Sequence, residues 1–188
     1  MRKIVVHMAV SLDGFFEGPD RDISWHTMDD EMLASIDEYL ATTSAFLFGR
    51  VTHQLMADFW PAADQDPDVS EPMGEFAAIY RRIPRIVFSR TLEQDEWATS
   101  VHREVDPEEI RALQEQPGGD MTIGGADLIN TFRKHDLIDE YRLFVNPVLL
   151  GRGRRLFGPD DAPRDLKLVE SRRFGNGVVM LRHARRRG

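Results

Sequence analysis

The chain has 188 residues, of which 41% are hydrophobic and 30% are charged, a composition typical of one folded domain with a substantial core. Its formal net charge of -8 argues against nucleic acid as a partner, because a polyanion would be repelled. The absence of cysteine excludes disulfides, thiolate metal sites and a cysteine nucleophile. No apolar run approaches the roughly 18 residues that a membrane span needs, so a membrane partner is not expected.

The N-terminal third alternates strand and helix signals. Residues 2–10 are rich in β-branched side chains and predict a buried strand rather than a signal peptide, so the cytoplasm is the expected location. Apolar residues spaced by three and four predict a helix over 29–42, with Thr27 as a plausible N-cap. A strand over 44–48 and a short helix over 52–57 follow.

The rest of the chain continues this alternation and ends in a hairpin. A surface loop is expected over 61–72, then a helix over 73–82 and strands over 85–88 and 99–104. Asp106 followed by Pro107 is a strong helix start. A strand over 141–150 contains Pro147, which indicates an edge or a bulge. The last two strands, 166–174 and 178–183, are joined by the tight-turn sequence Gly175-Asn176-Gly177.

This order of elements predicts the fold class. It favours a three-layer α/β/α sandwich, with a mostly parallel twisted sheet and an antiparallel C-terminal hairpin. Residues 1–188 are expected to form a single domain, with residues 182–188 as a flexible tail.

Paired glycines, Gly124-Gly125, separate a short apolar strand over 121–123 from a helical pattern that includes Leu128 and Phe132. A strand that turns through glycines into a helix presents free backbone N–H groups and the positive end of the helix dipole. An anion, typically phosphate, binds well there. A tight turn without a ligand is the alternative, and the pattern is neither G-x-G-x-x-G nor a Walker loop.

Ligands of open α/β sheets bind beyond the carboxyl ends of the strands. Polar residues or glycines follow four predicted strands, at Ser11-Leu12-Asp13-Gly14, Gly49-Arg50-Val51-Thr52, Ser89-Arg90 and Gly124-Gly125. A turn, a helix cap or a solvated arginine explains any one of them. Together they predict one rim with arginines, hydroxyls and a glycine turn, which suits a ligand with several phosphates.

The motifs along the chain resemble those of the dihydrofolate reductase superfamily. They are Ala9-Val10-Ser11-Leu12-Asp13-Gly14, Trp25, Gly49-Arg50-Val51-Thr52, Ser89-Arg90, Ile123-Gly124-Gly125-Ala126 and Pro147-Val148-Leu149-Leu150-Gly151. The chain is most similar to stand-alone proteins that resemble the C-terminal reductase domain of the bifunctional riboflavin-biosynthesis deaminase/reductase. That resemblance implies a three-layer α/β sandwich, NADPH as the cofactor and a homodimer. No zinc-deaminase half is expected, since cysteine is absent.

The resemblance also implies which residues bind the cofactor. They are Gly124, Gly125 and Ala126 at the pyrophosphate, Gly49, Arg50 and Thr52 beside the phosphates, and Ser89 and Arg90 at the adenosine ribose and its 2′-phosphate. Arginine suits the last position because its fork pairs two phosphate oxygens at once. The family element continues with a Glu two residues after the Thr, whereas this chain has Gln54, so any role of that carboxylate is lost.

Hydride transfer to a C=N or C=O bond needs a proton, so an acid or an ordered water must lie nearby. Dihydrofolate reductase has an acid five residues beyond a Trp, and Trp25 plus five is Asp30. Acids in the first turn of a helix also stabilise it without any chemistry. Asp13 is the other candidate, because the family's Ser-x-Asp-Gly turn faces the nicotinamide and the substrate. A plain turn aspartate is its alternative.

The remaining basic residues suggest no second chemistry. His7 is expected in the core, and the other histidines show no metal spacing, so no metal site is expected. Arg152, Arg154 and Arg155 could hold a substrate phosphate, with solvated surface arginines as the alternative.

The sequence therefore predicts an NADPH-dependent reductase acting on a small heteroaromatic or imine-bearing molecule, such as a pyrimidine or a pteridine. One rival is a nucleotide- or flavin-binding protein of the same fold without turnover, since a fold does not determine a function. A second rival is a dimeric scaffold that has lost the cofactor.

Overall fold

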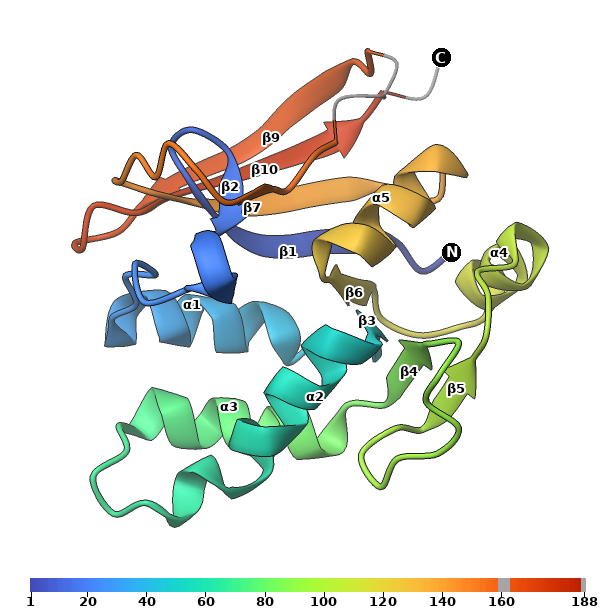
Figure 1. Cartoon of the computed structure of the whole chain (residues 1–188), viewed down its shortest axis with the longest axis horizontal. Coiled ribbons are helices and arrows are strands. Elements are labelled where there is room, and N and C mark those ends of the chain that lie inside the picture. Colours follow the sequence, from blue (N-terminus) through green and yellow to red (C-terminus); the bar gives the residue numbers. More distant parts are fainter. Residues whose placement is uncertain (159–162, 187–188) are drawn as a thin grey trace.

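The computed structural model describes residues 1–158 and 163–186. A central sheet has the strand order β5-β4-β3-β6-β1-β7-β10-β9 (Figure 1). Its strands are β1 (Ile4–Ser11), β3 (Ala45–Gly49), β4 (Arg85–Phe88), β5 (Ser100–His102), β6 (Met121–Gly124), β7 (Glu140–Asn146), β9 (Leu166–Arg173) and β10 (Val179–Arg185). A separate two-stranded ribbon pairs β2 (Phe15–Glu17) with β8 (Arg154–Arg155).

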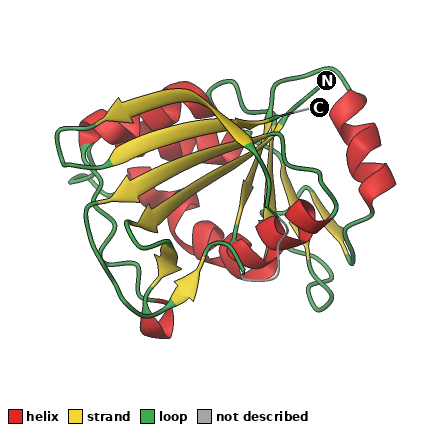
Figure 2. Ribbon diagram, turned by 90° about the horizontal axis from the view of Figure 1, so that it is seen from above, coloured by secondary structure: helices red, strands yellow, loops and turns green. Residues whose placement is uncertain are grey.

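The directions of the strands confirm the predicted fold class. The strands from β5 to β7 pair in parallel, β10 pairs antiparallel to β7, and β9 pairs antiparallel to β10. Figure 2 shows the twist of this sheet from above. The carboxyl ends of the parallel strands therefore lie along one edge, which we call the carboxyl edge.

Helices cover both faces of the sheet, as Figure 1 shows. The α-helices are α1 (Asp30–Leu40), α2 (Arg50–Phe59), α3 (Glu71–Arg82), α4 (Pro107–Glu115) and α5 (Ala126–Lys134), with 3-10 turns η1 (Pro19–Arg21) and η2 (Trp60–Gln65). Apolar side chains of α1 and α3, such as Ile36 and Tyr80, pack on one face with Phe46 and Phe144. Those of α4 and α5 pack on the other face against β1, β3 and β6.

Helix starts show how local sequence determines the element bounds. Asp106 caps α4 as predicted, because its carboxylate accepts a hydrogen bond from the Glu108 N–H at 2.8 Å. The expected N-cap Thr27 of α1 is wrong: Asp29 caps the helix by accepting from Met32 N–H at 2.9 Å. The Thr27 N–H instead donates to Asn146 Oδ1 at 2.9 Å and joins this segment to the end of β7.

Several element ends differ from the prediction. β7 ends at Asn146, directly before Pro147, because proline has no N–H for the ladder. Part of the loop expected over 61–72 is the 3-10 turn η2, and α3 already begins at Glu71. β10 continues to Arg185, inside the segment expected to be a tail, and Arg185 pairs there with Asp136. Residues 187–188 of that segment lie outside the described residues.

Candidate functional site at the carboxyl edge

The predicted site segments meet at the carboxyl edge. Register pairs Gly49 at the end of β3 with Phe88 of β4, and Phe48 with Gly124 at the end of β6. The segments that begin at Gly49, Ser89 and Gly125 therefore start at the ends of three neighbouring strands. β1 and β7 extend the same edge, where Ser11 pairs with Asn146. The expected single rim is thus present in the fold.

The turn between β6 and α5 needs glycine for a reason that the sequence did not reveal. Gly125 has a φ of 91°, and a Cβ there would lie 2.5 Å from Thr52 Oγ1. A Cβ on Gly124 would lie 3.2 Å from the Phe48 ring. No side chain caps the N-terminus of α5, which begins at Ala126. The N–H groups of its first turn are therefore available to an anionic ligand.

Arg50 opens α2 at the end of the neighbouring strand. Gly49 is the N-cap of this helix and provides no side-chain cap. The exposed Arg50 guanidinium donates from Nη1 to Gln54 Oε1 at 2.9 Å. A glutamate at position 54 would form an ion pair with Arg50, whereas the neutral glutamine orients the guanidinium and leaves its charge unbalanced. The departure from the family pattern thus keeps Arg50 suited to a phosphate.

Ser89 and Arg90 begin the loop that follows β4. Ser89 Oγ accepts hydrogen bonds from Thr91 N–H at 3.2 Å and Leu92 N–H at 2.9 Å, which defines a tight turn. The Ser89 N–H donates to the His102 carbonyl at 2.9 Å and fixes the turn to β5. Arg90 is exposed, and its guanidinium has no hydrogen bond or ion pair within residues 1–158 and 163–186.

Asp13 holds two loops of the edge together. Its carboxylate accepts from Ser11 Oγ at 2.7 Å, from Leu150 N–H at 3.1 Å and from Gly151 N–H at 2.8 Å. The Ser11 hydrogen bond, with those from Gly151 and Leu150, lowers the pKa of Asp13 to about 2. The carboxylate is therefore ionised at neutral pH, so it can orient a group but cannot donate a proton.

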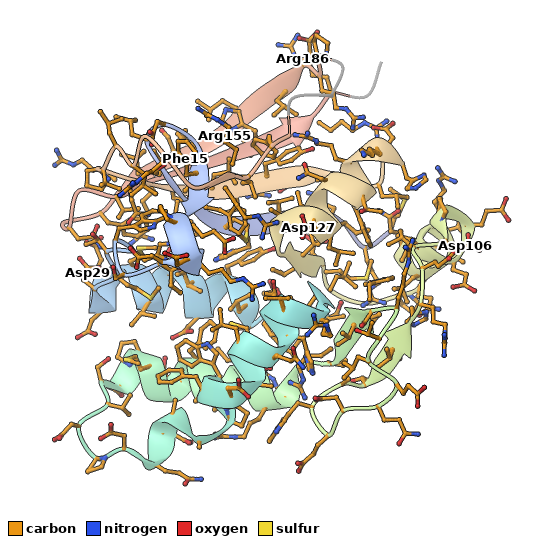
Figure 3. All side chains as sticks on the ribbon, in the orientation of Figure 1. Phe15, Asp29, Asp106, Asp127, Arg155 and Arg186 are labelled. Carbon is orange, nitrogen blue, oxygen red and sulfur yellow. The ribbon has the colours of Figure 1, made fainter. Side chains whose placement is uncertain are left out.

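Asp30 lies in the exposed first turn of α1, next to the capping residue Asp29, which Figure 3 labels. The Thr27–Asn146 hydrogen bond places this turn beside the end of β7, so Asp30 is also near the carboxyl edge. His26, which was not chosen as a site residue, lies in the same segment. Burial lowers the pKa of His26, and its Nε2 has no hydrogen-bond partner among the described residues. Its ring is therefore a neutral polar group near this edge.

The basic loop after β7 is largely occupied by internal contacts. Arg154 donates to Glu17 at 2.9 Å and to Asp127 of α5 at 2.8 Å. Arg155 donates to the Asp13 carbonyl at 2.8 Å, and its guanidinium lies over the Phe15 ring, 4.4 Å from the centroid (Figure 3). These two arginines connect the loops at the edge, which leaves the exposed Arg152 as the better candidate for a substrate phosphate.

Other groups considered in the sequence do not add to this site. His7 stacks on Tyr39, and burial, with a contribution from Arg142, lowers its pKa to about 3, so the ring is neutral. Among the described residues no group of His, Asp and Glu could hold a metal ion. Within the same residues, no helix is long and apolar enough to cross a membrane.

The fold and the edge define an α/β sandwich with a glycine turn and two exposed arginines along neighbouring strand ends. The model of the RibD C-terminal domain family matches residues 2–180, and the chain belongs to that family of reductase-like domains. The resemblance drawn from the motifs is thereby confirmed.

Known proteins are similar to this chain in sequence or in fold. The uncharacterized protein YyaP of Bacillus subtilis is 35% identical over 182 residues, covering 96% of this chain and 93% of YyaP. The crystal structure of a putative riboflavin biosynthesis protein from Shewanella sp. PV-4 superposes with a TM-score of 0.74 at 22% identity, covering 100% of both chains. A diaminohydroxyphosphoribosylaminopyrimidine deaminase/5-amino-6-(5-phosphoribosylamino)uracil reductase from Thermotoga maritima gives a TM-score of 0.66 at 17% identity, covering 98% of this chain but 56% of that one.

Proposed function

We propose that this protein is an NADPH-dependent reductase whose cofactor binds along the carboxyl edge. The observation that carries the proposal is the meeting of the Gly124-Gly125 turn, Arg50 and the Ser89-Arg90 loop at three neighbouring strand ends. The turn would hold the pyrophosphate with Ala126, with Thr52 and Gly49 beside it. The bound nicotinamide supplies a hydride, and the chain's own residues position the reactants and hold water away.

The proposed substrate is a small heteroaromatic or imine-bearing molecule of the pyrimidine or pteridine type. Membership of the RibD C-terminal domain family supports this class, as does the name of the Thermotoga maritima protein, a phosphoribosylaminouracil reductase. In this proposal the ionised Asp13 orients the substrate or a water. Asp30 or that water would deliver the proton.

One observation favours the rival without turnover. Asp13 is held ionised by three donors, so the better-placed candidate acid has no proton to give. A protein that only binds a nucleotide would need no such acid. The two functions differ in turnover and agree in cofactor binding.

Two measurements separate these possibilities. The first is thermal unfolding with NADPH or NADH, and the second is NADPH oxidation across a panel of dihydropteridines and aminopyrimidines. A reductase is stabilised by NADPH and oxidises it with at least one substrate. Stabilisation without oxidation across the panel would favour the binding protein, and stabilisation by neither cofactor would favour a scaffold.

We further propose that the protein acts as a homodimer. The edge strand β9 supports this, because it exposes Leu166, Leu168 and Val169 among its charged residues, and an edge strand with exposed apolar side chains can pair with another chain. Light scattering at micromolar concentration tests the state. A monomer at all concentrations would contradict it.

A further inference from the structure

His53 is the fully buried residue of α2, and it is polar. Its exposed fraction is 0%, whereas the rest of this helix is exposed or half-buried. Its Nε2 lies 2.8 Å from Asp95 Oδ1, and its Nδ1 has no hydrogen-bond partner in the part of the chain that the structure describes. Because an ionised carboxylate only accepts, the proton belongs on Nε2, and His53 donates it to Asp95.

Asp95 anchors the loop over residues 89–99 that connects β4 to β5 and begins with Ser89-Arg90. The same Oδ1 also accepts from Trp97 N–H at 2.9 Å. Burial raises the pKa of Asp95, but the hydrogen bonds from His53 and Trp97 outweigh it and leave the pKa below its usual value. The carboxylate is thus charged and satisfied at neutral pH. Within the described residues, the His53–Asp95 hydrogen bond is the one that joins this loop to α2.

The first turn of α2 therefore contacts two other segments of the edge through consecutive residues. Thr52 faces the glycine turn, and its Oγ1 would lie 2.5 Å from a Cβ built on Gly125. The next residue, His53, holds the loop that carries Arg90. The His53–Asp95 hydrogen bond therefore links α2, which carries Arg50, to the loop that carries Arg90, in addition to the pairing of β3 with β4.

We propose that His53 and Asp95 form a positioning pair that sets the distance between Arg90 and Arg50, and thereby the preference of the edge for a 2′-phosphorylated nicotinamide cofactor. This proposal rests on the proposed function. The Gly124-Gly125 turn joins β6 to α5, and neither of these elements carries His53 or Asp95. NADH, which lacks the 2′-phosphate, should therefore respond to loss of the pair much less than NADPH.

Fluorescence titrations with NADPH and NADH on matched variants test this. His53→Phe fills the buried volume without a donor, whereas His53→Gln offers an amide N–H in place of Nε2. His53→Phe should weaken NADPH binding about tenfold, as for the loss of one charge-assisted hydrogen bond, and NADH binding less than twofold. His53→Gln should recover most of the loss. Adding Asp95→Ala to His53→Phe should weaken NADPH binding no further, because the pair acts as a unit.

A control variant removes a comparable anchor from another loop. Arg81 Nη2 pairs with Asp64 Oδ2 at 2.6 Å, near the amino end of β4 rather than the carboxyl edge. Asp64→Ala should leave the NADPH/NADH ratio unchanged. In the cofactor-free protein with Trp25 and Trp60 replaced by Phe, the emission of Trp97 reports whether the loop has moved, and it should shift with His53→Phe but not with Asp64→Ala.

The outcomes separate this proposal from the function on which it rests. If the wild type prefers NADPH and a folded His53→Phe keeps the same ratio, the positioning pair is contradicted and the reductase stands. If His53→Phe does not fold, Asp95→Ala carries the same expectation, since Asp95 is 24% exposed and its removal leaves a smaller cavity. If the wild type binds neither cofactor, the proposed function fails and this proposal fails with it.

Discussion

Thr52 Oγ1 of α2 lies 2.5 Å from the position of a Cβ built on Gly125, so the β6–α5 turn has no space for a side chain where it faces α2. A side chain at position 125 would also be strained, because the φ of Gly125 is 91°.

Gly125→Val should therefore weaken NADPH binding by tenfold or more, since the loss of one charge-assisted hydrogen bond at the turn costs roughly 1.5–3 kcal/mol. Fluorescence titration of a folded variant measures it. Gly74→Ala is the control, because a Cβ at Gly74 of α3 would meet no atom within 4 Å and Gly74 lies outside the proposed site. An unchanged dissociation constant for Gly125→Val would remove the turn from the proposed site.

The two candidate carboxylates should behave differently. Asp30→Asn should lower turnover by about 10²–10⁴-fold at unchanged NADPH affinity if Asp30 delivers the proton. Asp13→Asn should also lower turnover, but by loosening the loop that Leu150 and Gly151 share with it. Steady-state kinetics with a substrate found by screening measures both. Full activity in both variants would assign the proton to water or to the substrate.

The pH profile distinguishes the same roles. The pKa of Asp13 is lowered to about 2, so its carboxylate stays ionised across the pH range 4–9 and contributes no ionisation to kcat/KM there. Because the folded pKa is depressed, the stability that Asp13 contributes is present above its unfolded pKa and is lost only as pH falls toward 2. An ionisation in kcat/KM near neutrality that Asp13→Asn abolishes would contradict this assignment.

Asp37 of α1 is expected to limit stability at neutral pH. It is 4% exposed, neither of its carboxyl oxygens has a hydrogen-bond partner among the described residues, and burial, reinforced by Glu75, raises its pKa to about 6. Because the folded pKa is raised, the cost of ionising Asp37 is fully present above about pH 6 and is relieved as pH falls from about 6 towards 4. Asp37→Asn should stabilise the protein by about 1–3 kcal/mol at pH 8 and by little at pH 4.

Urea unfolding at both pH values measures this effect. Glu38→Gln provides the control, because Glu38 is the exposed carboxylate next along the same helix and its loss should change stability by under about 0.5 kcal/mol. Equal stabilisation by Asp37→Asn at pH 8 and pH 4 would show that packing, rather than charge burial, is responsible.

Much of the fold was predictable because its signals are local. The Asp106-Pro107 start of α4 depends on neighbouring residues alone and is confirmed. Thr27 shows the limit of such reasoning: its N–H is bound by Asn146, 119 residues away, and Asp29 takes the cap instead. Pro147 was placed within a strand by the apolar run around it, whereas the strand ends where the ladder loses its donor.

The residues of the candidate site likewise include some that local sequence reveals and others that only the fold brings together. Gly124-Gly125 and Ser89-Arg90 were recognisable because each follows a strand, and parallel strands bring their ends together. The His53–Asp95 hydrogen bond joins residues 42 positions apart in segments without a shared pattern, so no local signal could reveal it. Arg154 likewise resembles a free cation in sequence, and its partners Glu17 and Asp127 are joined to it only by the fold.

Arg50 and Arg90 should determine the choice of cofactor. The 2′-phosphate alone distinguishes NADPH from NADH, and on a chain of net charge -8 these exposed arginines offset the repulsion of a polyanion. If one of them contributes a charge-assisted hydrogen bond of roughly 1.5–3 kcal/mol, NADPH should bind about 10- to 150-fold more tightly than NADH. Raising salt should reduce that ratio, because both side chains are open to solvent.

Titrations with NADPH and with NADH test the central claim most directly. They compare the wild type with Arg50→Ala and Arg90→Ala. We expect a clear preference for NADPH in the wild type, and its loss on replacing the responsible arginine while NADH affinity stays nearly constant. Equal affinities for the two cofactors in the wild type, or a ratio that both substitutions leave intact, would show that these arginines are only surface charges and would contradict the proposed NADPH site.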